Sequence, residues 1–399
     1  MSQKTVSEGI RLITWATAIR WAGWGFVDAL IPIFLLSFTN SYAELGILGS
    51  IDDLIFVLTT PFIGLLADKI SSVTLILIGL AMYPLISASY FLAGFTGLAI
   101  FLIIGRVLNG INYSFDCVGR GTYLRRHAHH GAIARTFGYF ETVSNTIWLL
   151  AVFASIFLVK YFNIHTLFLL IIPTSIIAFI IVKKIKSDKK ESFKDGMKEI
   201  IHEGVLKTLF HEIYHWSRPL RNAALLTLLL GSIQAIAGIF IPVYIFLDQQ
   251  NITQAILITA ALALPNIFAL PIAKYVDGNA KKMITASCLG TATLFIILST
   301  TENYVGQFII ALLLGTTLLI TRLGINDITT TLTKKKEYGS ISGALEGLET
   351  LGEVIGPIIF GIALDYIQGS TLFFATAIAI IILTILIRPR LDQPITISN

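Results

Sequence analysis

The chain alternates apolar runs of about 20 residues with short polar segments, and no other feature restricts its fold as strongly. A helix rises about 1.5 Å per residue, so a run of this length matches the bilayer's hydrocarbon core of about 30 Å. Twelve such runs are present: 12–37, 43–66, 73–93, 97–118, 134–159, 165–182, 222–247, 252–276, 283–300, 304–323, 341–363 and 371–387. The sequence therefore predicts an all-α membrane protein with twelve transmembrane helices.

Composition agrees with this prediction. Hydrophobic residues make up 55% of the chain and charged residues only 13%, whereas a soluble domain carries about 25% charge. The run at 12–37 is too long for a cleavable signal, contains Arg20 and Asp28, and is followed by no small-residue cleavage site. Cys117 and Cys288 form neither a disulfide framework nor a metal-binding spacing, so we expect no metal and no cofactor.

The distribution of basic residues sets the expected orientation. With the N-terminus inside, 25 of the 29 Lys and Arg residues fall on the inner side and only Lys160 falls on the outer side. This count places Arg135 and Lys274, at the inner ends of their runs, on the inner side; the other three, Arg20, Arg106 and Arg322, lie deeper within runs. This asymmetry follows the positive-inside rule, and it accounts for the net charge of +5 without nucleic acid. We expect a multi-pass protein of the plasma (inner) membrane with both termini cytoplasmic.

A polar segment at residues 183–221 separates the first six runs from the last six. It holds ten Lys and Arg residues, interleaved acids, and apolar residues at helical spacing. Two interpretations remain open: an amphipathic helix on the inner membrane surface, or a solvated helix packed against the base of the protein. Either one predicts an N-terminal six-helix bundle at 1–182, a cytoplasmic amphipathic linker at 183–221 and a C-terminal six-helix bundle at 222–399.

The two halves repeat each other. Asp68 lies just after the second run and Asp277 just after the eighth, 209 residues later. Glu141 in the fifth run and Glu349 in the eleventh are 208 residues apart. A nearly constant offset indicates two pseudo-symmetric bundles related by duplication. Transporters built this way bind substrate between their halves, near the middle of the membrane.

The segment 64–73 resembles the loop signature of the major facilitator superfamily, G-x-L-A-D-R-x-G-R-K. The matching residues are Gly64, Leu66, Ala67 and Asp68, with Lys69 in place of Arg; the G-R-K end is missing at Ser71, Ser72 and Val73. The second copy keeps Asp277, Lys281 and Lys282. This resemblance implies the major facilitator fold, alternating access, and a gate in which Asp68 faces the start of the eleventh span. In the family the basic end of the signature pairs with an acid low on span 4. Because that end is missing here, we expect Lys281 or Lys282 to form an inner latch with Asp327.

The fourth run also carries a family resemblance, to the signature R-x-x-Q-G. It reads Arg106-Val107-Leu108-Asn109-Gly110. In drug/proton antiporters of the family this Arg is associated with proton transfer, so the resemblance favours proton-coupled efflux. The antiporter signature of span 5, G-x-x-x-G-P-x-x-G-G, is absent from 134–159, and a similar pattern stands in the eleventh run at Gly352, Gly356, Pro357 and Gly361. Proton-symport uptake of a metabolite is therefore the alternative.

Polar and charged residues within the runs are the candidate proton-coupling and cavity residues, because a charge at the bilayer centre costs about 3 kcal/mol and normally faces a cavity or a partner. They are Arg20, Asp28, Asp52, Asp53, Arg106, Glu141, Gln234, Arg322, Glu349 and Glu353. The functional interpretation is a mixed-charge cavity for an amphipathic or zwitterionic solute, with Glu141 beside Arg106 as the proton carrier and Glu349 as its alternative. The structural interpretation is ion pairing between helices, of Arg106 with Glu141 or of Arg322 with Glu349.

A zinc motif is also present. His211-Glu212-Ile213-Tyr214-His215 fits H-E-x-x-H, which supplies two zinc ligands and a base. It raises a remote alternative, a site-2-type membrane metalloprotease, but its place in the polar linker argues against that. A transport-dead sensor is a further alternative. We expect a monomeric transporter, not an enzyme, whose partners are a small-molecule substrate, protons and the lipid bilayer.

Overall fold

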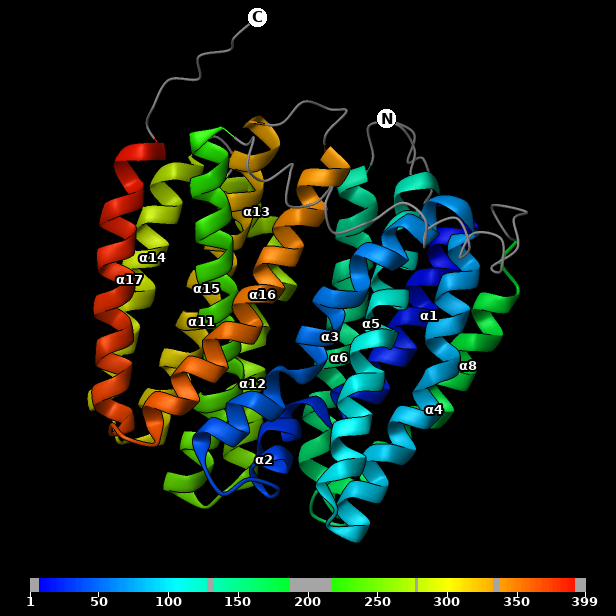
Figure 1. Cartoon of the computed structure of the whole chain (residues 1–399), viewed down its shortest axis with the longest axis horizontal. Helices are drawn as coiled ribbons and strands as arrows, with labels where there is room; N and C mark the ends of the chain where they lie inside the picture. Colours follow the sequence, from blue (N-terminus) through cyan, green and yellow to red (C-terminus); the bar gives the residue numbers. More distant parts are fainter. Residues whose placement is uncertain (1–6, 128–132, 187–216, 277–278, 333–337, 392–399) are drawn as a thin grey trace, which may run out of the picture. The chain divides into compact units, whose positions relative to one another are not determined.

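The structure is a computed structural model that describes residues 7–127, 133–186, 217–276, 279–332 and 338–391. The regular secondary structure of these residues is entirely helical (Figure 1). The chain groups into two compact units. Unit 1 comprises Met1–Phe38 and Ile51–Lys207, and unit 2 comprises Thr39–Ser50 and Thr208–Asn399. Residues 187–216, with the H-E-x-x-H segment, lie outside the described residues, so the linker helix and the predicted boundaries at 183–221 stay predictions.

Unit 1 is built from long helices joined by short turns. Its elements are α1 (Glu8–Gly25), η1 (Asp28–Leu30), α2 (Ile31–Leu36), most of α3 (Tyr42–Lys69), α4 (Ser72–Thr96), α5 (Ala99–His127), α6 (Ile133–Leu158), α7 (Ile164–Leu167), η2 (Phe168–Leu170) and α8 (Ile171–Lys183). Helix α4 packs along α5, and α1 packs against α6 and α8. Aromatic side chains fill the interior: Tyr90 stacks on Phe168 with ring centroids 4.6 Å apart, and Trp24 meets Tyr90 edge-on.

Unit 2 has the same kind of construction. Its elements are the start of α3, then α11 (Arg218–Gln249), α12 (Ile252–Ala263), η3 (Leu264–Phe268), α13 (Ala269–Val276), α14 (Ala280–Thr300), α15 (Tyr304–Leu332), α16 (Tyr338–Leu364) and α17 (Gly369–Leu391). Helix α11 packs on α16, and α14 lies between α15 and α17. The core includes Phe240, Phe295, Phe360 and Phe373, whose rings contact one another.

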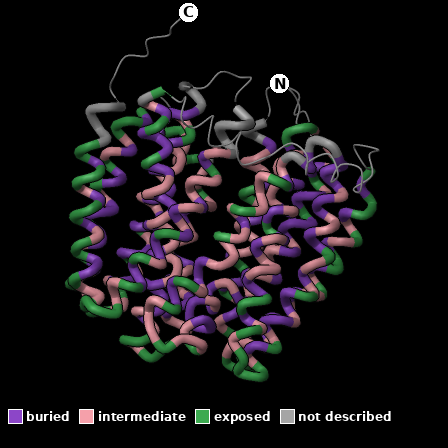
Figure 2. The backbone as a smooth tube through the Cα atoms, in the orientation of Figure 1, coloured by how far each residue is buried: buried purple, intermediate pink, exposed green. Residues whose placement is uncertain are grey.

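Ten of the described helical segments are long and apolar enough to cross a membrane. Two more complete the predicted set: α5 is long but carries several charges, and the segment formed by α12, η3 and α13 is broken into shorter pieces. The exposed side chains of the spans include many large apolar residues, as expected for contact with lipid. Phe374, Ile378, Ile382 and Ile385 recur at helical spacing along α17 and are all exposed. Figure 2 shows exposed positions along the length of this helix. An apolar face of this size is expected against hydrocarbon, not water.

The fourth span is longer than its apolar run predicts. The run predicts that the span ends at about residue 118, but α5 continues to His127 and buries Arg120. That prediction is wrong because an apolar run marks contact with lipid, and a helix continues past it where charged side chains find partners.

Three of the predicted spans are also interrupted, at η1, η2 and η3. Pro265 stands within η3, where its missing N–H favours a break.

Candidate functional site

The first membrane segment is interrupted at a carboxylate. Helix α1 ends at Gly25, and the short η1 begins at Asp28. The Asp28 carboxylate accepts a hydrogen bond from the indole Nε1 of Trp148 on α6, at 3.0 Å. Irregular backbone at membrane depth is tolerated only where protein buries it or where it lines a cavity. The break therefore gives unit 1 a polar position in the middle of an otherwise apolar segment.

A second polar cluster joins α3 to α5. Arg106 forms an ion pair with Asp52, and their side chains are only 6% and 14% exposed. The Asn109 side-chain amide donates to the other Asp52 oxygen at 2.9 Å, and the backbone N–H of Asp53 donates to Asp52 at 3.1 Å. One carboxylate thus accepts from a guanidinium, an amide and a backbone N–H. The sequence named Arg106 and Asp52 as two separate candidate residues, and in the structure their side chains form an ion pair.

This cluster gives a physical reason for the R-x-x-N-G pattern. Arg106, Asn109 and Gly110 occupy positions i, i+3 and i+4, so they lie on one face of α5. Arg106 and Asn109 hold the Asp52 side chain, while Gly110 lies against the backbone of the same residue. A Cβ at Gly110 would lie 2.4 Å from the Asp52 carbonyl oxygen and 2.7 Å from Ile55 Cβ. All three residues of the pattern therefore serve one contact between α5 and α3.

A third cluster lies about three turns further along α5 and is almost fully buried. Asp116 Oδ2 is 2.8 Å from Arg20 Nη2 on α1 and 2.9 Å from Arg120 Nε. The three side chains are 1%, 3% and 7% exposed, respectively. Arg20 also donates to the Tyr83 hydroxyl of α4. Two guanidinium groups share one carboxylate, so the cluster carries one net positive charge inside unit 1.

Aromatic rings surround these two guanidinium groups. Arg120 lies over the rings of Trp21 and Phe140, 5.6 and 5.3 Å from their centroids. Arg20 lies 5.2 Å from the Tyr83 ring centroid. Desolvated cation–π contacts each contribute up to about 2 kcal/mol, so the rings offset part of the uncompensated charge. Sequence reasoning missed Asp116, Arg120 and Tyr83; the i, i+4 spacing of Asp116 and Arg120 on one helix was the available signal.

Unit 2 holds a comparable but more open cluster. Arg322 of α15 forms an ion pair with Glu349 of α16, with Nη2 at 2.6 Å, and also donates from Nη2 to the Gln234 side chain of α11 at 3.0 Å. The Arg322 side chain is 41% exposed and that of Glu349 20%. The pair between Arg322 and Glu349, one of the two structural pairings expected from sequence, is present. Glu353 lies one turn further along α16 and is half-buried.

The other expected pairing differs. Arg106 has its ion pair with Asp52, not with Glu141. Glu141 is exposed and accepts a hydrogen bond from the Asn145 side chain one turn along the same helix, at 3.0 Å. Within the described part of the chain, Glu141 therefore lacks the ion pair with Arg106 on which its predicted role depended, and Asp52 is the partner of Arg106.

The loop-signature residues are only partly described. The side chains of Asp68 and Lys69, and residue Asp277, lie outside the described residues, while Gly64 is placed with open space around its Cα. Lys281 and Lys282 are exposed and Asp327 is half-buried, so their latch stays a prediction. Arg126 at the end of α5 donates to the Ala67 carbonyl at 2.9 Å, near the C-terminal end of α3. A cation there satisfies a helix-end carbonyl.

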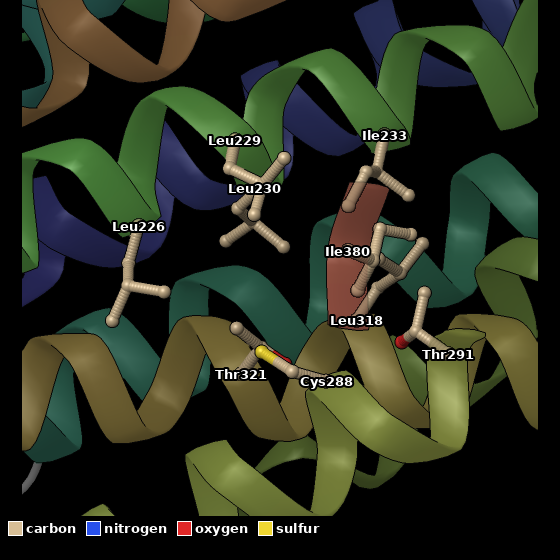
Figure 3. A pocket seen from close by; sticks show the side chains of 9 residues that line it. All are labelled: Leu226, Leu229, Leu230, Ile233, Cys288, Thr291, Leu318, Thr321 and Ile380. Atoms are coloured by element: carbon tan, nitrogen blue, oxygen red, sulfur yellow. The ribbon is translucent and has the colours of Figure 1, made fainter. Parts of the chain in front are cut away.

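A small pocket in unit 2 lies between α11, α14, α15 and α17 (Figure 3). Leucines and Ile233 of α11 line one side, and Cys288, Thr291 and Thr321 line the other. The hydroxyls already bond across helices: Thr291 donates to Thr317, and Thr321 lies 2.8 Å from the Ser287 hydroxyl. The pocket therefore offers mainly apolar surface, and the charged clusters are the better candidates for function.

Solved structures share this fold at low sequence identity. The nucleoside transporter NupG, as a point mutant, aligns with a TM-score of 0.78 at 13% identity, covering 96% of this chain and 100% of that chain. The NupG structure without that mutation gives 0.75 at 14% identity, over 97% and 100%. The human organic anion transporter MFSD10 gives 0.65 at 11% identity, over 96% and 98%. A search of curated proteins finds no match.

A family model provides the stronger comparison. The model described as Major Facilitator Superfamily matches residues 13–352, which include Asp28, the two ion-pair clusters of unit 1 and the one of unit 2. Together with the fold, this match identifies a multi-pass membrane transporter and not an enzyme. The chain belongs to the Major Facilitator Superfamily.

Proposed function

We propose that the protein is a proton-coupled secondary transporter that moves a small organic solute by alternating access, in the direction of efflux. The observation that carries the proposal is the buried cluster of Arg106, Asp52 and Asn109 inside a membrane-spanning part of unit 1. Replacing a buried ion pair with apolar residues is often neutral or stabilising. The ion pair within this span is therefore better explained by a role of its charges in transport than by a contribution to stability.

The proposed coupling step is an exchange of partners by Asp52. While Arg106 faces it, the carboxylate is ionised and compensated. When substrate draws the guanidinium away, an ionised carboxylate at that depth is left uncompensated, and binding a proton removes the charge. Asp28 supplies a second carboxylate in the same unit, bonded to the Trp148 indole. Asp52 replaces Glu141 as our preferred proton carrier, and Glu349, paired with Arg322, is the candidate in unit 2.

The substrate class follows from the mixture of charges. Unit 1 offers carboxylates at Asp28 and Asp52, and unit 2 offers the half-exposed Arg322 beside Gln234. Groups of both signs, with amides nearby, suit an amphipathic or zwitterionic solute. The similar structures are those of a nucleoside transporter and an organic anion transporter, so both classes of ligand belong in a ligand screen.

Direction and setting complete the proposal. The span 4 pattern favours efflux by exchange with protons. Uptake by proton symport is the second candidate, because α6 lacks the span 5 antiporter signature. We further propose a monomer in the plasma (inner) membrane with both termini cytoplasmic, on the basis of the charge asymmetry of the loops.

The test begins with a thermal-shift screen of the purified protein, followed by flux of the best ligand in proteoliposomes under an imposed pH gradient. Asp52→Asn should still bind the ligand but should lose gradient-driven accumulation. Glu141→Gln is the matched control and should keep it. Accumulation that survives Asp52→Asn would reject Asp52 as the carrier. Wild-type flux that ignores the pH gradient would reject proton coupling altogether, and the sign of the required gradient separates efflux from uptake.

A further inference from the structure

The N-terminal end of α3 is capped in two ways. The first N–H groups of a helix have no acceptor within the helix and need one from elsewhere. Ser41 serves two of them: its hydroxyl accepts from the Glu44 N–H at 3.2 Å, and its carbonyl accepts from Leu45 N–H at 3.2 Å. The Glu44 carboxylate accepts from the Asn40 N–H at 2.7 Å. This local capping box leaves the N–H groups of residues 42 and 43 to be satisfied.

Asp365, more than 300 positions along the chain, satisfies both. Its Oδ1 accepts from the Tyr42 N–H at 2.7 Å, and its Oδ2 accepts from the Ala43 N–H at 3.1 Å. Asp365 directly follows the last residue of α16. Both carboxylate oxygens are therefore used on the positive end of another helix, where an anion is stabilised by the helix dipole.

Close backbone packing continues below this cap. A Cβ at Gly46 would lie 2.2 Å from the Pro357 carbonyl oxygen, and a Cβ at Gly361 would lie 2.3 Å from the Tyr42 carbonyl oxygen. One turn deeper, the Ser50 hydroxyl is 3.1 Å from the Val354 carbonyl oxygen. Small residues on both helices thus let residues 42–50 lie directly on α16.

Helix α3 connects this contact to the other unit. Its residues 42–50 group with unit 2, whereas the rest of the same continuous helix groups with unit 1. Any rearrangement of unit 1 relative to unit 2 must therefore bend α3 or separate its start from α16. We propose that Asp365 is a latch that holds the start of α3 on α16, and that the transport cycle releases it. The predicted topology places this end outside.

The latch rests on the alternating-access part of the proposed function, but thiol reactivity tests it without any substrate or proton gradient. Ser50 is the reporter because it is only 2% exposed beneath the contact. Ser50→Cys, with Cys117 and Cys288 replaced by serine, would be reacted with an impermeant maleimide in nanodiscs, where both faces are accessible. Asp365→Asn and Asp365→Ala should each raise the labelling rate about tenfold, because two charge-assisted hydrogen bonds are weakened or lost.

Three controls fix the interpretation. Asp248→Asn removes an exposed acid of unit 2 that accepts a hydrogen bond from the Gln249 side chain, and it should leave labelling unchanged. In a parallel set that keeps the buried Cys288 and lacks the reporter, labelling must stay slow, which excludes unfolding. Gly46→Leu, which wedges the two helices apart, should raise labelling even with Asp365 intact. The latch is overturned if Gly46→Leu raises labelling and the Asp365 variants do not, or if no variant changes it.

Discussion

Replacing Asp116 with asparagine isolates the buried charge cluster of unit 1. The carboxylate is 1% exposed and lies 2.8 and 2.9 Å from two guanidinium groups that are themselves 3% and 7% exposed. Two nitrogens of Arg20, Nε and Nη2, already lack a well-aligned hydrogen bond within the described residues, so Nη2 depends on charge attraction to Asp116. Asp116→Asn would keep the shape of the side chain and leave both cations without their counter-charge.

The expected cost follows from this burial. Removing one partner of a buried ion pair costs about 3–5 kcal/mol. At such low exposure, solvent screening offsets little of that cost. For a domain of about 150–250 residues, each kcal/mol lowers the unfolding midpoint by about 2–4 °C. Asp116→Asn should therefore lower the midpoint by at least about 6 °C.

Thermal unfolding in detergent, followed by tryptophan emission, measures this shift. Trp21 is a local reporter because its ring lies 5.6 Å from the Arg120 guanidinium carbon. The control Asp248→Asn changes the same residue type at an exposed position and should stay within about 1 °C of wild type. Adding Arg120→Gln to Asp116→Asn returns the cluster to a single net positive charge and should recover part of the loss. A midpoint unchanged by Asp116→Asn, or no recovery in the double variant, would refute the electrostatic account of this cluster.

Two further predictions concern helix packing and topology. Gly110→Ala places a Cβ 2.4 Å from the Asp52 carbonyl oxygen, so it should cost about 1–3 kcal/mol in unfolding free energy and lower flux; Gly138→Ala, which meets nothing within 4 Å, should change neither. Single cysteines at Asn40, Asn251 and Gly369, in a background without Cys117 and Cys288, should react with an impermeant maleimide from outside intact cells. Cysteines at the exposed Lys183 and Lys282 should not react there, and reaction at either one would reject the predicted orientation.

Helix positions were largely predictable because hydrocarbon thickness dictates the length of an apolar run. The run at 73–93 becomes α4 (Ser72–Thr96), and the run at 283–300 becomes α14 (Ala280–Thr300). The breaks at η1 and η2 were not predicted, because hydropathy averages over a window and does not register a local change in backbone geometry. The end of α5 was missed for a related reason: its last turns are stabilised by ion pairs, which lower hydropathy.

Pairings between helices were less predictable than the helices themselves. A pairing depends on how each helix is rotated and which helices are neighbours, and neither is encoded in the depth of a residue along its own span. When only depth in the membrane is considered, Glu141 is as suitable an ion-pair partner for Arg106 as Asp52 is. The spacing of Arg106, Asn109 and Gly110 was available in the sequence and places the three on one face of a helix. Only the structure shows that they all contact Asp52.

The incomplete loop signature has a physical counterpart in the structure. In the family resemblance, the basic end of that signature pairs with an acid low on span 4, and Ser71, Ser72 and Val73 cannot supply it here. Asp116 is the single acid in α5, and it receives its cations from within the bundle, from Arg20 and Arg120. The end of α3 in turn receives a cation from Arg126. Among the described residues, cations of α1 and α5 contact Asp116 and the end of α3, so Asp116 is tied to the interior of unit 1. We therefore expect control of the conformational cycle to depend on Arg126 in unit 1 and, in the second copy of the signature, on Lys281 and Lys282.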